Sequence, residues 1–354
     1  MNLAVSKVAV LGAGSWGTAF AKVVADAAME SSSGVQVSLW GRNEQAMAEM
    51  ARTGINSRYF PDHRLPENLV ATGDLSQALT GAEIVVLAVP AQNLREQLHA
   101  VAPHLGEDAV MVSLAKGLEQ GSGLRMSEVI TQVLTGHFPH QSAEQIDRRI
   151  SVLSGPNLAR EIMSEQPTAS VVAAHDEQIA ASIAAVCACS YFRPYTGTDI
   201  VGVEIGGLVK NVIALCVGIC EGRNYGDNSK ASVMTRGLAE ITRLALALGA
   251  DGATLSGLAG MGDLIATCSS PLSRNHTAGR LLAEGIDPDQ LSTVMTQTAE
   301  SVKTAPVVAQ LARQHGVEMP ITEAVVAVLT HRLSVEDLAP QLLGRRLKTE
   351  NPHR

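Results

Sequence analysis

Short apolar runs alternate with helical patterns through the first half of the chain. Several of these runs are apolar at nearly every position, which is typical of parallel strands buried on both faces. Helical patterns separate the runs, such as the one with Phe20 and Val23 on its apolar face. This alternation predicts an α/β domain. The expected strands are Lys7–Leu11, Val35–Trp40, Leu69–Thr72, Ile84–Pro90, Ala109–Leu114, Ile150–Leu153, Thr168–Ala174 and Tyr191–Tyr195.

The second half of the chain has a different period. From about Thr198 the apolar positions follow the helical repeat as far as the C-terminal region. We therefore expect two domains, an α/β domain over residues 1–197 and an all-helical domain over residues 198–354. A length of 354 residues agrees with two domains of ordinary size.

Three glycines follow the first expected strand in the spacing G-x-G-x-x-G. Gly12 lets the chain turn sharply, Gly14 allows close approach of a pyrophosphate, and Gly17 lets strand and helix pack closely. The helix opens at Ser15 and Trp16, and its free N–H groups favour an anion. A glycine-rich turn without a ligand is the alternative. The strand–turn–helix context favours a Rossmann-like dinucleotide-binding domain.

The second expected strand bears on the choice of cofactor. NAD-binding folds of this kind place Asp or Glu near the end of that strand to hold the ribose hydroxyls. Here the strand ends Trp40-Gly41-Arg42-Asn43, without a carboxylate. The guanidinium of Arg42 suits a 2′-phosphate, and a solvated surface arginine is the alternative. We expect NAD or NADP as cofactor, with Arg42 slightly favouring NADP.

Two lysines stand in positions that suit chemistry. Lys116 follows an expected buried strand, and ligands of open α/β sheets bind at the C-terminal ends of strands. The alternative is an ordinary surface lysine. Lys210 lies in the middle of an expected helix that is apolar nearly all round, with Gly206 and Gly207 one turn before it. Burial makes a lysine a suitable general base, and the glycines would leave room for a ligand; snorkelling into water is the alternative.

A third group of candidates lies further along the chain. Asp263 follows a glycine-rich stretch, and Ser273-Arg274-Asn275 precedes another helical run. An arginine together with helix N–H groups forms a good phosphate site. Plain N-caps at Asp263 and Ser273, with Arg274 in solvent, are the alternative.

Composition excludes several classes of partner. The net charge of −8 argues against a nucleic-acid surface. No run approaches the roughly 20 apolar residues that a membrane span needs, so we expect none. The five cysteines form no disulfide framework, which suits a reducing cytoplasm. They lie mainly in apolar helical stretches, where core packing explains them better than metal binding, and we expect no metal.

Several further motifs occur in a specific order. The chain carries Lys116-Gly117, Ser154-Gly155-Pro156-x-x-Ala159, Gly206 to Asn211, Gly257 to Leu264 and Ser273-Arg274-Asn275 after the N-terminal glycines. In this order they resemble the NAD(P)-dependent glycerol-3-phosphate dehydrogenases of the bacterial type. The stretches Asn56–Pro61, Thr235–Glu240 and Gly316–Ile321 are also similar to that family, so the resemblance covers nearly the whole chain.

The resemblance implies a function and a set of site residues. It implies a site between a Rossmann-like domain and a helical domain. The implied reaction is reversible reduction of dihydroxyacetone phosphate to sn-glycerol 3-phosphate for glycerophospholipid synthesis. A homodimer is compatible with it. Lys210 takes the position of the proton acceptor. The positions matching substrate contacts are Lys116, Gly155, Asn157, Asp263, Ser273, Arg274 and Asn275. Those matching cofactor contacts are Gly12, Gly14, Ser15, Trp16, Gly17, Arg42, Tyr59, Lys116, Ala159, Arg274, Thr298 and Glu300.

The chain departs from the family pattern at three places. Asn157 stands where a hydroxyl residue is usual, and it binds substrate through its amide or caps the following helix. Ala115 replaces a common Ser or Thr before Lys116. The run Thr298–Val302 also differs, which weakens the cofactor positions in it. We expect activity to be kept, with cofactor preference or affinity altered.

Other functions remain open at this point. A related dehydrogenase could act on a hydroxy acid or an acyl thioester, although the cluster around Arg274 argues for a small phosphorylated substrate. A regulatory protein could sense NAD(P) without turnover, but it would not need a lysine such as Lys210 in a buried helix. A hydrolase is disfavoured because Ala13 breaks the G-x-S-x-G pattern around Ser15.

Overall fold

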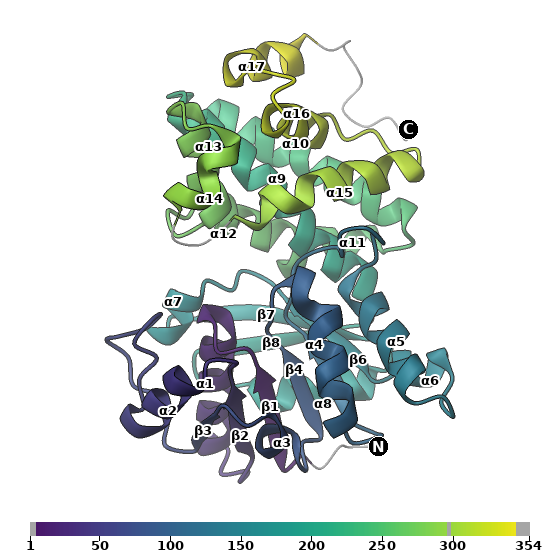
Figure 1. Ribbon diagram of the computed structural model, residues 1–354. Coiled ribbons are helices and arrows are strands. Elements are labelled where there is room, and N and C mark those ends of the chain that lie inside the picture. The colour runs from purple at the N-terminus through teal and green to yellow at the C-terminus, as the bar shows by residue number, and fades with distance from the viewer. Residues whose placement is uncertain (1–4, 296–298, 345–354) are drawn as a thin grey trace. The chain divides into compact units, whose positions relative to one another are not determined.

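The computed structural model describes residues 5–295 and 299–344 (Figure 1). The chain folds into two compact units. The first unit comprises Met1–Leu208 and Leu248–Asp263, and the second comprises Val209–Ala247 and Leu264–Arg354. The division falls inside helix α9 (Ile200–Gly222).

The first unit is built on one sheet of eight strands. The expected α/β class is confirmed, and each expected strand is present within three residues of its expected bounds. The strand order is β3-β2-β1-β4-β5-β6-β7-β8, and neighbours are parallel except β6 and β7. The strands are β1 (Lys7–Leu11), β2 (Gln36–Trp40), β3 (Leu69–Thr72), β4 (Ile84–Leu87), β5 (Val110–Ser113), β6 (Ile150–Ser154), β7 (Thr168–Ala174) and β8 (Phe192–Gly197).

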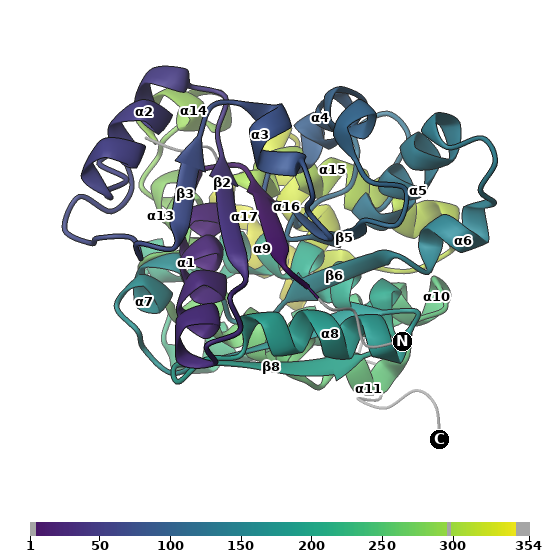
Figure 2. The same cartoon turned by 90° about the horizontal axis from the view of Figure 1, so that it is seen from below.

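Helices cover both faces of this sheet, as Figure 2 shows. The alternation of side chains along each strand explains why both faces are apolar. Val8 and Val10 of β1 belong to one buried cluster, whereas Ala9 and Leu11 belong to another. The first cluster includes α1 (Ser15–Glu30), α2 (Glu44–Thr53), α7 (Ala159–Met163) and α8 (Glu177–Cys187). The second includes α3 (Leu75–Leu79), α4 (Leu94–Val101), α5 (Met126–His137) and α6 (Ala143–Asp147).

The beginning of α9 also packs on this sheet. Ile200 and Val203 form a small cluster with Val152 of β6, Ala173 of β7 and Ala259. Ala259 lies in the π-helical turn η3 (Leu258–Gly262), which follows α11 (Gly252–Leu255). Turns of this kind are rare and occur often at functional sites. Helix α12 (Asp263–Ser269) continues directly from it.

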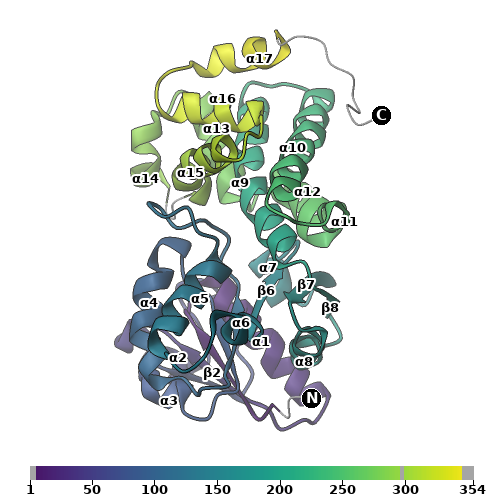
Figure 3. The same cartoon turned by 90° about the vertical axis from the view of Figure 1, so that its right-hand side faces the viewer.

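The described residues of the second unit are helical throughout (Figure 3). Helix α16 packs against α10, α15 and α17. The helices and turns of this unit, beyond the shared α9 and α12, are α10 (Asp227–Ala247), α13 (Arg274–Ala283), η4 (Pro288–Gln290), α14 (Leu291–Val294), α15 (Glu300–Gln314), α16 (Pro320–Leu329) and α17 (Val335–Leu343).

Helix α9 is the one described helix long and apolar enough to cross a membrane. We expected no such segment, because no apolar run in the sequence approaches about 20 residues. Most of its apolar stretch (89%) is buried inside the protein, as in a core helix. Burial against protein explains its composition without a bilayer.

Two of the stretches that resemble the family turn out to be structural partners. The carboxylate of Glu240 on α10 accepts hydrogen bonds from the backbone N–H of Ile321 (2.6 Å) and of Thr322 (3.2 Å). It therefore satisfies the N–H groups that open α16, behind Pro320. Burial raises the pKa of Glu240 from 4.5 to about 7.

The raised pKa of Glu240 predicts a pH-dependent stability. Between its pKa in the unfolded chain and its higher pKa in the folded protein, Glu240 is protonated only in the folded protein. Raising the pH through this interval therefore lowers the free energy of unfolding, and the loss is complete above the folded-state pKa. We expect wild type to lose about 2 kcal/mol more unfolding free energy between about pH 5.5 and 8 than Glu240→Gln does. Urea unfolding at the two pH values measures this difference, and equal losses in both proteins would contradict it.

Candidate active site

The glycine-rich turn joins β1 to α1. Gly12 has a φ of +119°, and a Cβ atom there would lie 2.5 Å from the carbonyl oxygen of Ala88. A Cβ atom on Gly17 would lie 1.9 Å from the carbonyl oxygen of Gly12. A Cβ atom on Gly14, by contrast, would have no described atom within 4 Å. Packing therefore requires the outer two glycines, and the middle one borders open space.

The N-terminus of α1 beside this open space suits an anion. Gly14 is its N-cap, no side chain of the described residues caps the helix, and the first turn holds no acidic residue. The N–H groups of the first turn before Thr18, whose own N–H donates to the carbonyl oxygen of Gly14, are therefore available to a phosphate. This arrangement fits the pyrophosphate of a dinucleotide.

Asn56 supports the same turn, and no local pattern in the sequence singled it out. Its buried side-chain Nδ2 donates to the backbone oxygen of Ala13 (3.2 Å) and to Oγ1 of Thr18 (2.8 Å). The amide thus ties the glycine-rich turn to the first turns of α1. Its partners lie about 40 residues away in sequence, so only the resemblance of the stretch from Asn56 to Pro61 could have pointed to it.

Three of the other expected cofactor positions pack against one apolar cluster of the first unit. Trp16, Tyr59 and Ala159 are partly buried against the same apolar cluster. The indole Nε1 of Trp16 is buried and has no hydrogen-bond partner among the described residues. Arg42 is exposed directly after β2 and forms no hydrogen bond or ion pair with any described residue. Glu300 opens α15 in the second unit, and Thr298 lies outside the described residues.

Lys116 and Asp263 form a buried ion pair within the first unit. Nζ of Lys116 lies 2.6 Å from Oδ2 of Asp263 and donates to the carbonyl oxygen of Gly155 at 3.2 Å. Asp263 is 1% exposed and the side chain of Lys116 is 16% exposed, so neither is an ordinary surface group. Lys116 follows β5 and Gly155 follows β6, so they meet at the C-terminal ends of neighbouring parallel strands.

Gly206 and Gly207 allow close packing of protein atoms, whereas we expected them to leave room for a ligand. A Cβ atom on Gly206 would lie 2.6 Å from the carbonyl oxygen of Ala259, and one on Gly207 would lie 2.6 Å from Oγ of Ser154. Protein atoms therefore fill the space that we expected a ligand to use. The glycines let α9 approach the π-helical turn and the end of β6 closely.

Lys210 is buried in the second unit. It is 6% exposed, which excludes the snorkelling alternative, and its Nζ donates to Oγ1 of Thr267 at 2.5 Å. Thr267 lies one turn after Asp263 on α12. Thr267 was not predicted from the sequence. Its spacing of four residues from Asp263 places the two side chains on the same face of a helix, and this spacing could have pointed to Thr267.

The Ser273 to Asn275 cluster opens α13. Ser273 is its N-cap and accepts from the backbone N–H of His276, and Arg274 is exposed at the first helical position. Asn275 is buried: its Nδ2 donates to Oδ1 of Asn211 (2.9 Å), and its Oδ1 accepts from the backbone N–H of Ser301 (3.0 Å). The amide of Asn275 therefore joins α9, α13 and α15.

Asn157 does not cap the following helix. The N-cap of α7 is Leu158, with no side-chain hydrogen bond. Oδ1 of Asn157 instead accepts from the hydroxyl of Ser170 at 2.8 Å, and its Nδ2 is buried without a hydrogen-bond partner among the described residues. The capping alternative is therefore wrong.

The expected site residues thus fall into two groups. The first unit brings Lys116, Gly155 and Asp263 into direct contact, with Asn157 two residues from Gly155. The second unit joins Asn275 to Asn211, the neighbour of Lys210 on α9.

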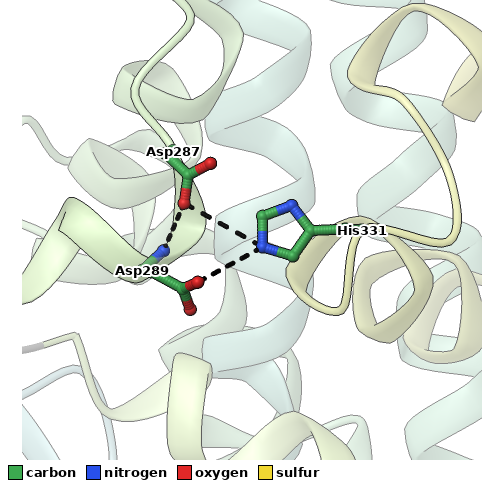
Figure 4. Close-up of side chains that lie close together, drawn as sticks. All are labelled: Asp287, Asp289 and His331. Atoms are coloured by element: carbon green, nitrogen blue, oxygen red, sulfur yellow. Dashed lines mark hydrogen bonds and ion pairs between the residues drawn. The ribbon is translucent and has the colours of Figure 1, made fainter.

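One group of side chains has the composition of a metal site. Asp287, Asp289 and His331 point toward one another, with Nε2 of His331 lying 3.5 Å from Asp289 and 3.9 Å from Asp287 (Figure 4). All three are exposed, as in ordinary surface ion pairs. We assign no role to this group.

The chain matches known proteins over nearly its whole length. The family model of the NAD-dependent glycerol-3-phosphate dehydrogenase N-terminus matches residues 7–180, and that of the C-terminus matches residues 199–340. The chain is 52% identical over 345 residues to glycerol-3-phosphate dehydrogenase [NAD(P)+] of Thermobifida fusca, covering 98% of both chains. It is 51% identical to the enzyme of that name from Streptomyces griseus, covering 97% of this chain and 98% of that one.

A solved structure shows the same similarity. The crystal structure of glycerol-3-phosphate dehydrogenase from Coxiella burnetii is 33% identical and has a TM-score of 0.86. The match covers 97% of this chain and 100% of that chain.

Proposed function

Because the chain belongs to the family of NAD-dependent glycerol-3-phosphate dehydrogenases, we propose that it reversibly reduces dihydroxyacetone phosphate to sn-glycerol 3-phosphate with NAD(P)H. The product would feed glycerophospholipid synthesis. The observation that carries the mechanism is the buried amine of Lys210, held by Thr267. An amine in such surroundings is suited to exchange a proton with a substrate oxygen.

Reduction at C2 requires a hydride on carbon and a proton on oxygen. Bound NAD(P)H supplies the hydride. Lys210 donates the proton to the oxygen on C2, and in the reverse direction it removes the proton from the hydroxyl. Its ammonium also stabilises the negative charge that develops on this oxygen. The Thr267 hydroxyl, 2.5 Å from Nζ, orients the amine.

We assign the remainder of the substrate to two sets of groups. Arg274 and the N–H groups that open α13 bind the phosphate, behind the N-cap Ser273. Lys116, paired with Asp263, binds the three-carbon part. The remaining substrate positions in this proposal are Gly155, Asn157 and Asn275.

The dinucleotide is assigned to the turn between β1 and α1. The open space at Gly14 and the N–H groups of the first turn of α1 support this assignment. The cofactor positions in this proposal are Gly12, Gly14, Ser15, Trp16, Gly17, Arg42, Tyr59, Lys116, Ala159, Arg274, Thr298 and Glu300.

The purified protein tests the activity directly. Consumption of NADH and of NADPH is followed by absorbance with and without dihydroxyacetone phosphate. We expect consumption that depends on the phosphorylated ketone. Cofactor binding without turnover would instead favour the regulatory alternative.

Arg42 tests the cofactor preference. Arg42→Ala removes an exposed guanidinium without breaking a hydrogen bond or ion pair to a described residue, so the fold should be unchanged. We expect KM for NADPH to rise about tenfold, because a charge-assisted bond to the 2′-phosphate is lost. KM for NADH should change little. An equal rise for both cofactors would remove Arg42 from this role.

The remaining parts of the proposal concern organisation. We place the domain boundary at 197/198, which the matched family ranges 7–180 and 199–340 support. We also propose a homodimer in the cytoplasm. Light scattering of the purified protein tests the homodimer, and a monomeric mass would exclude the dimer.

A further inference from the structure

A buried hydroxyl of the sheet controls the side chain of Asn157. Ser170 lies in β7 and is 0% exposed. Its Oγ is 2.8 Å from Oδ1 of Asn157 and 3.2 Å from the backbone oxygen of Ser154. A serine hydroxyl has one proton, so it can donate to one of these acceptors at a time. The shorter distance is to Asn157.

The loop between β6 and α7 is built around this serine. A Cβ atom on Gly155 would lie 3.0 Å from Oγ of Ser170, and the φ of Gly155 is +147°. Only glycine therefore lets the chain turn tightly over Ser170 and bring Asn157 back to it. The same Gly155 offers its carbonyl oxygen to Lys116.

The hydrogen bond from Ser170 determines which end of the Asn157 amide can bind another group. With Oδ1 held by Ser170, the Nδ2 group is the free end, and it is buried without a partner among the described residues. An unsatisfied buried donor costs folding free energy, so its retention calls for an explanation. An acceptor oxygen of a ligand bound at this loop would satisfy it.

We infer that Ser170 is a positioning residue that orients the Asn157 amide so that Nδ2 donates to an oxygen of the substrate. This inference rests on the proposed function and adds a specificity element to it. Where the family usually has a hydroxyl, which both donates and accepts, this chain would present a donor alone. The group facing Asn157 must then be an acceptor oxygen.

The test is a double-mutant cycle on the full-length protein with dihydroxyacetone phosphate as substrate. Ser170→Ala lets the amide rotate, so KM for the ketone should rise about three- to tenfold, while kcat changes less than about twofold. In the Asn157→Ala background the same substitution should have no further effect on KM, because its target is gone. Equal effects in both backgrounds would overturn the inference.

Ser151 provides a matched control. It is also 0% exposed, and its hydroxyl donates to the backbone oxygen of Ala173 at 2.9 Å across the same pair of strands. Ser151→Ala should lower stability about as much as Ser170→Ala and leave KM unchanged. A similar rise in KM for both variants would show a purely structural effect and overturn the inference.

Asn157→Asp tests the donor without touching Ser170. Ser170 can donate to one carboxylate oxygen, which leaves the other oxygen where Nδ2 was. We expect KM for the ketone to rise more than about tenfold, with the Kd for NADH unchanged, because two acceptors would face each other. A near-normal KM would mean that Asn157 presents its oxygen, and would overturn the inference. If the wild-type protein does not turn over dihydroxyacetone phosphate, the proposed function fails. If it does, the results with the variants test the role of Ser170 alone.

Discussion

Lys210→Ala is expected to lower kcat by about 100- to 10,000-fold, the range that general acid–base catalysis contributes. The affinity for NADH should stay within about twofold, because in our proposal Lys210 acts on the substrate oxygen. Stopped-flow turnover with dihydroxyacetone phosphate and fluorescence titration with NADH measure the two quantities. A kcat close to that of wild type would refute the role of Lys210.

Another buried lysine serves as the control for this experiment. Lys22 is 5% exposed on α1, and its Nζ contacts Asp26 and Glu165. Lys22→Met should reduce stability, because it removes one partner from a buried ion pair. It should leave kcat near the wild-type value. A comparable loss of kcat in both variants would mean that the loss of any buried lysine lowers kcat, and that the effect at Lys210 is not specific to its chemistry.

The second large effect is expected on stability. Lys116→Met removes the ammonium 2.6 Å from the carboxylate of Asp263, which is 1% exposed. Removing one partner of a buried ion pair costs about 3–5 kcal/mol of unfolding free energy. Urea unfolding should show this loss, and KM for dihydroxyacetone phosphate should rise as well.

Neutralising Asp263 as well separates the effect of Lys116→Met on stability from its effect on turnover. In the double variant Lys116→Met with Asp263→Asn, the buried charge is gone, so we expect most of the lost stability to return. Turnover should remain impaired, because neither polar group is restored. Stability losses that simply add in the double variant would contradict the ion-pair explanation.

The sequence predicted much of the first unit correctly because the relevant signals are local. The eight strands follow from runs of apolar residues, and the turn at Gly12 follows from the G-x-G-x-x-G spacing, in agreement with the positive φ of Gly12. The direction of β7 was not predicted. It pairs antiparallel with β6, and an apolar run does not record which way a neighbour runs.

Partners in the site were predicted less well. Lys210 was identified as a candidate, but its partner Thr267 lies 57 residues away. The explanation of Gly206 and Gly207 as room for a ligand was wrong, since Ala259 and Ser154 fill that space. These contacts join distant segments, and no periodicity within one segment encodes them.

By itself, the sequence determined the order of strands and helices, the dinucleotide turn and the lysine in an apolar helix. Each of these depends on the period of neighbouring side chains or on the conformation of one residue. The tertiary structure alone decided that Lys116 meets Asp263, 147 residues away, and that Ser170 orients Asn157. Such pairings arise only when packing of the sheet and helices brings distant polar groups within hydrogen-bond distance, where burial leaves them no water to bind.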